Sequence, residues 1–173
     1  MKRMLMPILL ALTGAQLKPV ATIPNAASRD DCAASEPGVR MTVSGLRDQS
    51  GRLKMELYPA DESDFLAKDD ALLRAGKVFR RVVAAVPPHA RDVSLCVNVP
   101  RPGRYAVLVV HKRSGNRRFS VDDDGVSLPG SQHIGRRRPP FGQANVTVGD
   151  EVTTVAAPVQ YLHGLAGFGE MLP

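Results

Sequence analysis

The sequence predicts an all-β protein, an antiparallel sandwich of about seven strands with one short helix. Three observations carry this prediction. Several segments alternate apolar and polar residues with a period of two, as strands with one buried face do. Gly and Pro number 15 and 14 in 173 residues, which supplies frequent turns. No repeated strand–helix–strand pattern, the mark of a parallel sheet, is present.

The first residues have the order of a secretory signal peptide. Lys2 and Arg3 precede the apolar run Met4–Leu12, and the small residues of Thr13–Ala15 match a cleavage site. The run is about nine residues long, whereas a membrane span needs about 20. The alternative is a buried N-terminal helix or strand. We expect a periplasmic or secreted protein with no transmembrane anchor.

Cys32 and Cys96 are the two cysteines of the chain. In an oxidising compartment an even pair predicts one disulfide. The alternative is two unrelated buried thiols. Neither cysteine belongs to a Cys-x-x-Cys pair and His is scarce, so we expect no zinc site.

The first half of the domain predicts a hairpin followed by a helix. Val39–Ser44 and Leu53–Tyr58 both alternate, and the turn cluster Asp48–Gly51 lies between them. A short helix is expected within residues 61–75, capped by Ser63 and ended by Gly76.

The second half predicts further strands. Val78–Val86 is β-branched, and Val93–Val99 places Leu95 in the core with Cys96 on the opposite face. Tyr105–His111, which includes Val107, is apolar enough to be a central strand buried on both faces. After a long excursion over residues 112–144, strands resume at 145–148 and 152–162.

These segments define the expected organisation of the chain. It comprises a signal peptide over residues 1–15 (with a second acceptable cut after residue 27), an irregular leader over 16–37, a β-sandwich domain over 38–162 and a flexible tail over 163–173.

The order of several short motifs resembles a family of exported bacterial proteins, the domain of unknown function 2141. The motifs are Ser44-Gly45-Leu46, Gly51–Tyr58, Phe65-Leu66, Pro102–Ala106, His111, Ser114-Gly115-Asn116, Asp122–Asp124 and Gly125–Gly130. The resemblance covers roughly residues 38–162. It implies a β-sandwich of transthyretin-like or immunoglobulin-like type, and it implies no known catalysis.

One loop departs from the family pattern. The usual loop reads His-Asp-x-Asn-Gly-Asn-Gly, followed by an acidic residue, and looks able to hold a cation. Here Lys112 stands where Asp is typical, and only Asn116 and the acidic residues Asp122 to Asp124 remain as oxygen donors. Calcium needs six to eight oxygen ligands, several of them anionic. We therefore expect a solvated loop with no metal.

The sequence contains no recognisable catalytic motif. The nucleophile elbow, the phosphate-binding loop and the zinc-protease helix motif are all absent. His111 is the one histidine inside a motif, and it either orients the following loop by a hydrogen bond or acts as a general base or ligand. We name no catalytic residues and expect no cofactor.

Arginines cluster in both halves of the excursion. They are Arg113, Arg117 and Arg118 in the first half and Arg136, Arg137 and Arg138 in the second. If both halves fold over the same end of the sandwich, these guanidinium groups face one region and suit phosphate or carboxylate. The alternative is a solvated basic loop. Alternation places Lys54 on a different exposed face.

Two classes of function follow from these observations. The first is an exported, non-catalytic envelope module that binds an anionic glycolipid or polymer. The second is an extracytoplasmic enzyme, such as a hydrolase, with a site near His111. Nucleic acid is excluded as a partner by the predicted compartment and by an aromatic content of only 5%.

Overall fold

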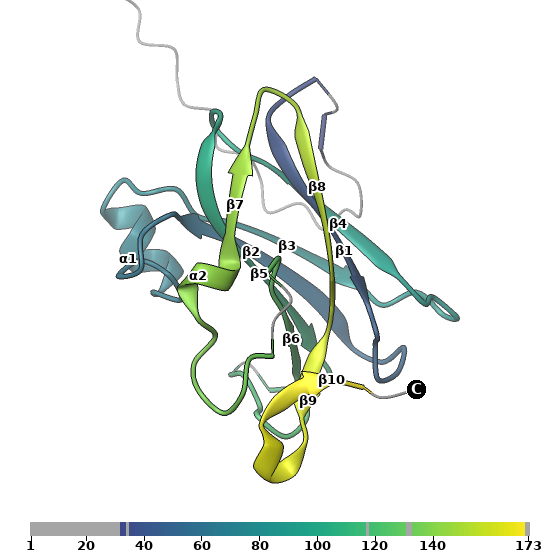
Figure 1. Ribbon diagram of the computed structural model, residues 1–173. Helices are drawn as coiled ribbons and strands as arrows, with labels where there is room; N and C mark the ends of the chain where they lie inside the picture. The colour runs from purple at the N-terminus through teal and green to yellow at the C-terminus, as the bar shows by residue number, and fades with distance from the viewer. Residues whose placement is uncertain (1–31, 34, 117, 131–132, 172–173) are drawn as a thin grey trace, which may run out of the picture.

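The protein is a sandwich of two packed sheets (Figure 1). The computed structural model describes residues 32, 33, 35–116, 118–130 and 133–171, and this part contains ten strands. The all-β prediction is confirmed. The predicted signal peptide and most of the predicted leader lie outside the described residues.

The smaller sheet has three strands in the order β4-β1-β8. The strand β1 (Gly38–Ser44) lies in the middle, antiparallel to β4 (Val93–Asn98) and parallel to β8 (Val152–Pro158). The parallel pair departs from the antiparallel arrangement that was predicted. It arises because the chain enters β8 only after crossing over from the larger sheet.

The larger sheet has seven strands and is built around β5 (Gly103–Lys112). Its main order is β10-β9-β6-β5-β2-β3, and β7 pairs with the other end of β5. The remaining bounds are β2 (Arg52–Pro59), β3 (Arg80–Ala85), β6 (Gly125–Ser127), β7 (Asn145–Val148), β9 (Gln160–Leu162) and β10 (Phe168–Glu170).

The predicted hairpin of β1 and β2 is wrong, because the two strands belong to different sheets. Residues 45–51 cross between the sheets, and Gly51 adopts a positive φ of 74° there. A Cβ at Gly51 would lie 2.2 Å from the backbone oxygen of Lys112, so the crossing passes directly over the end of β5. Alternation identified the face of each strand that lies in the main core, but Glu56 and Tyr58 on the other face of β2 are also buried. Alternation carries no information on the partners of a strand.

The predicted helix exists but begins later than expected. Helix α1 is Asp69–Arg74, and Ser63 instead bonds Asp61 in a preceding turn. Gly76 ends the helix as predicted, since its N–H and that of Lys77 bond the carbonyls of Leu73 and Leu72. No helix in the described part of the chain is long and apolar enough to cross a membrane.

Strand β5 buries side chains on both faces, as predicted for a central strand. Val107 and Val109 face the smaller sheet in the main core, and Leu108 and Val110 face a second core on the outer side of the larger sheet. The predicted excursion supplies part of this second core through β6 and the short helix α2 (Phe141–Ala144).

The end of the chain is more structured than the predicted flexible tail. A short 3-10 helix at Gly164–Ala166 leads into β10, which pairs with β9. Phe168 of β10 is buried in the second core. This aromatic side chain was not counted among the predicted core residues.

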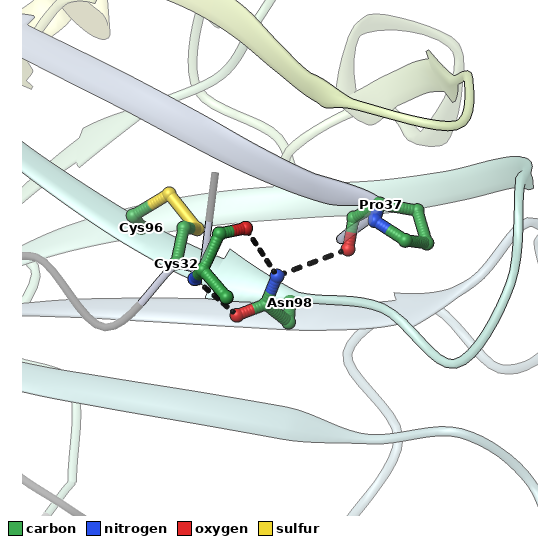
Figure 2. Close-up of a disulfide and its surroundings, with 5 residues drawn as sticks. Cys32, Pro37, Cys96 and Asn98 are labelled. Carbon is green, nitrogen blue, oxygen red and sulfur yellow. Dashed lines mark hydrogen bonds between the residues drawn. A yellow bond between two sulfur atoms is a disulfide. The ribbon is translucent and has the colours of Figure 1, made fainter. Parts of the chain in front are cut away.

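The predicted disulfide joins Cys32 to Cys96, with their Cα atoms 5.5 Å apart (Figure 2). Cys96 lies on the face of β4 opposite Leu95 and Val97, as alternation required. Beside it, the Asn98 side chain accepts a hydrogen bond from the Ala33 N–H and donates to the Pro37 carbonyl. The bridge and Asn98 together hold Cys32, Ala33 and Pro37 against the smaller sheet.

Replacing Leu95 with Ala should lower the free energy of unfolding by about 2–4 kcal/mol, because the side chain is fully buried and leaves a cavity. Urea denaturation measures this loss. The control is Leu165→Ala at an exposed position, which should change stability by less than about 0.5 kcal/mol. An unchanged midpoint for Leu95→Ala would place this side chain outside the core.

Replacing Cys32 and Cys96 together with Ser should cost about 4 kcal/mol, the chain-entropy value for a loop closed across 64 residues. Hydrogen exchange should rise first at Ala33, Ser35 and Glu36, because the bridge beside them is lost. A reducing agent should reproduce both effects in the parent and have none in the double variant. Two free thiols in the exported, non-reduced protein would contradict the bridge.

Candidate functional site

The loop after β5 is organised by one buried carboxylate, that of Asp124. Its oxygens accept hydrogen bonds from the backbone N–H groups of Arg113, Ser114 and Ser120, at 2.8–2.9 Å. The Lys112 ammonium lies 2.5 Å from Oδ2. Burial alone would raise the pKa of Asp124, but Lys112 and these N–H groups outweigh it and hold the pKa below its usual range.

The Lys112 ammonium lies inside this loop. Besides Asp124 it donates to the Ser114 hydroxyl and to the Arg118 carbonyl, at 2.7 and 2.5 Å. Its positive charge compensates the buried carboxylate. Of the other predicted motif residues, Asn116 and Asp122 are exposed, so the structure does not bring the candidate oxygen donors together.

His111 is fully buried at the end of β5 and is hydrogen-bonded at both ring nitrogens. Nε2 lies 2.8 Å from the Ser50 carbonyl, which can only accept, so Nε2 carries the hydrogen. Nδ1 lies 2.5 Å from the Tyr161 hydroxyl and accepts a hydrogen bond from it. The same hydroxyl oxygen accepts a hydrogen bond from the Arg47 N–H. Burial lowers the pKa of His111, which matches a neutral ring.

His111 therefore holds residues 45–51, the crossing between the sheets, onto β5 and β9. The prediction that it orients the following loop is wrong, because Asp124 organises that loop. A general base needs a nitrogen that can reach substrate. Both nitrogens of His111 are used by the protein, so this geometry gives no support to catalysis.

Arg113 and Asp48 form an ion pair between the loop after β5 and the same crossing. The guanidinium donates to Asp48 Oδ2 through both Nε and Nη2, at 2.8 and 2.5 Å. Hydrogen bonding to Arg113 holds the pKa of Asp48 well below its usual range, and the same contact raises the pKa of Arg113. The donor fork of Arg113 is thus already occupied within the protein.

The other predicted arginines divide into three groups. Arg118, Arg136 and Arg137 are exposed and their guanidinium groups have no hydrogen-bond partner among the described residues, and Arg138 is exposed too. Arg138 is anchored, since its guanidinium donates to the Phe65 carbonyl. Arg117 lies outside the described residues.

The two halves of the excursion converge on Phe168. Phe119, next to Arg118, packs against the Phe168 ring with centroids 6.1 Å apart. Gly135, next to Arg136, pairs with the backbone of Phe168. Arg118 and Arg136 are therefore sequence neighbours of two residues that contact Phe168, one through its ring and the other through its backbone. Sequence reasoning did not identify Phe119 or Phe168, because isolated aromatics follow no periodic pattern here.

Lys54 lies on this same face and not on a different one. Its side chain contributes to a hollow that Phe119 and Pro139, from the two halves of the excursion, also line. The expectation that Lys54 is remote from the arginine-bearing segments is wrong. Alternation predicts which residues of a strand point away from the core. It does not predict which other segments of the chain fold over those residues.

The protein is thus a disulfide-bonded β-sandwich. The described residues within 59–79 and 112–144 pack over the outer face of its larger sheet, and we call these two segments the cover. A family profile described as "Uncharacterized protein conserved in bacteria (DUF2141)" matches residues 41–156. The chain belongs to this family. No curated protein matches it. No solved structure matches it either.

Stability should fall as the pH drops below about 6.5, because the unfolded chain then takes up a proton that native His111 resists. Above that pH both states are neutral at this site and its contribution is complete. Urea denaturation at about pH 7.5 and about pH 5.5 should show a smaller difference for His111→Gln than for the parent.

The matched control for this experiment is Arg101→Gln at an exposed position, which should keep the parental difference. Equal differences in the parent and in His111→Gln would show that the ring takes no part in the pH dependence.

Proposed function

We propose that the protein is an exported, non-catalytic module of the bacterial envelope that binds an anionic ligand, such as a phosphorylated glycolipid. The observation that carries this proposal is the convergence of the segments bearing Arg118 and Arg136 on Phe168. Arg137 adds a third exposed guanidinium beside them.

The chemistry of these side chains favours an anion. Arginine is permanently charged, and its planar donor fork matches phosphate and carboxylate. Arg118, Arg136 and Arg137 form no ion pair with any described carboxylate, in contrast to Arg113. The formal net charge is +6, and removal of the predicted signal peptide with Lys2 and Arg3 leaves +4, which would still attract anionic surfaces over long range.

Two observations support export. The Cys32–Cys96 disulfide is typical of proteins in oxidising compartments. The predicted signal peptide would deliver the chain there. A phosphorylated envelope lipid is a ligand available in that compartment.

Replacing Arg118, Arg136 and Arg137 together with Gln should weaken binding to purified lipopolysaccharide, a phosphorylated glycolipid, by roughly tenfold at low salt. This follows from about 0.5 kcal/mol for each exposed charge contact. The parental affinity should fall steeply with added salt, and the variant should show a shallower dependence. Titration by fluorescence or calorimetry at several salt concentrations measures both.

The control changes Arg91, Arg101 and Arg104 to Gln, which removes the same charge from exposed positions in other loops and strands. It should retain most of the parental affinity. If the test variant keeps the parental affinity, or if the parent does not bind, these arginines are hydrated surface residues that bind no anionic ligand.

A further inference from the structure

Two hollows on the outer face of the larger sheet share Lys54 and Lys112. One has a volume of about 310 Å³ and is mainly apolar. The other has a volume of about 420 Å³ and is lined by Arg52 and Arg113 in addition to the two shared lysines. The two hollows therefore meet at Lys54 and Lys112, where an apolar surface passes directly into a basic one.

The floor of the apolar hollow is formed by the outward residues of two paired strands. Leu108 and Val110 come from β5, and Val126 of β6 pairs directly with Val110. The walls are Leu66, Phe119 and Pro139, one from each of three segments that cover this face. The volume lies near the lower end of the range for small-molecule sites.

Phe119 is the wall residue most open to solvent. Its side chain is 43% exposed although it is a large apolar group. It follows the exposed Arg118 in sequence, and both residues also line a separate surface hollow next to this one. An exposed aromatic on the rim of an apolar hollow is a typical anchor for an apolar ligand.

The charges around the basic hollow leave a positive excess. Arg113 is paired with Asp48, Lys112 with Asp124, and Lys54 with Glu56, whose carboxylate also accepts from Arg81. Arg52 is exposed, and no described carboxylate pairs with it. The Lys54 ammonium lies 3.1 Å from Glu56 Oε1, and an ammonium has three donors, so donors remain for a second acceptor.

We propose that these joined hollows bind one molecule of an anionic lipid, with an acyl chain over Leu108 and Val110 and the anionic head at Lys54 and Arg52. This inference rests on the proposed function for the source of the ligand, and it adds a built site to the general attraction of the arginines. A volume of about 310 Å³ walled on three sides accommodates a single chain and not a bilayer surface.

The test uses dodecyl phosphate below its critical micelle concentration, with dodecyl maltoside as the neutral-headed probe and inorganic phosphate as the head alone. Calorimetric titration should show that dodecyl phosphate binds at least tenfold more tightly than either. Phe119→Ser should weaken dodecyl phosphate binding several-fold, and Arg52→Gln with Lys54→Gln should remove its advantage over dodecyl maltoside.

Matched controls exist on the same chain. Leu165→Ser removes an apolar side chain that is 85% exposed and lies outside the hollow, and Arg101→Gln with Arg104→Gln removes two exposed charges elsewhere. Both should leave dodecyl phosphate affinity unchanged. Phe119→Leu, which keeps an apolar wall, should retain most of the binding, and urea denaturation should confirm that every variant is folded.

Three results would overturn the inference: no binding of dodecyl phosphate, equal binding of dodecyl maltoside, or equal effects of the test and control variants. Lipopolysaccharide binding that depends on Arg118, Arg136 and Arg137 without dodecyl phosphate binding would remove the joined hollows and leave the proposed function in place. Dodecyl phosphate binding without lipopolysaccharide binding would keep the site and remove the envelope glycolipid as its ligand.

Discussion

Strand β5 buries both of its faces, and the three-stranded sheet is able to cover only one of them. The outer side chains of β5, Leu108 and Val110, must be removed from water by something else, since apolar burial is the main source of stability. Residues 59–79 and 112–144 do this, with Phe65, Leu128 and Phe168 among the side chains of the second core. The long irregular excursion is thus a structural cover and not only a connection.

The cover needs anchors, because it contains little regular secondary structure of its own. The buried Asp124 carboxylate gathers backbone N–H groups of the loop, and Lys112 supplies the opposing charge from the end of β5. On the other side of the same strand end, His111 and Tyr161 hold the crossing between the sheets. Arg113 joins these two regions through Asp48, so that the end of β5 fixes both.

Sequence patterns predicted much of this architecture, because burial on a strand follows alternation. The faces of Leu95 and Cys96 were obtained in this way. The disulfide was predicted from the even pair of cysteines, and the burial of Val107 from the continuous apolar run of its strand. The patterns failed where pairing or cover is decided by contacts remote in sequence. The β1–β2 crossing reads like a hairpin, and α1 begins at Asp69 although Ser63 is a better cap by type. Asp122 and Asp124 are equivalent in sequence, yet only the second is buried.

The same separation of core and cover accounts for the position of the proposed binding surface. Its segments turn apolar side chains such as Phe65 and Ile134 toward the sheet, so their remaining residues face solvent and are free to carry charge. Where Leu66, Phe119 and Pro139 approach one another without closing, part of the apolar floor stays open between basic residues. Exposed arginines contribute little to the core, so recognition on this face is able to change independently of the fold. The anchors Asp124 and His111 do not have that freedom, because each satisfies several buried groups at once.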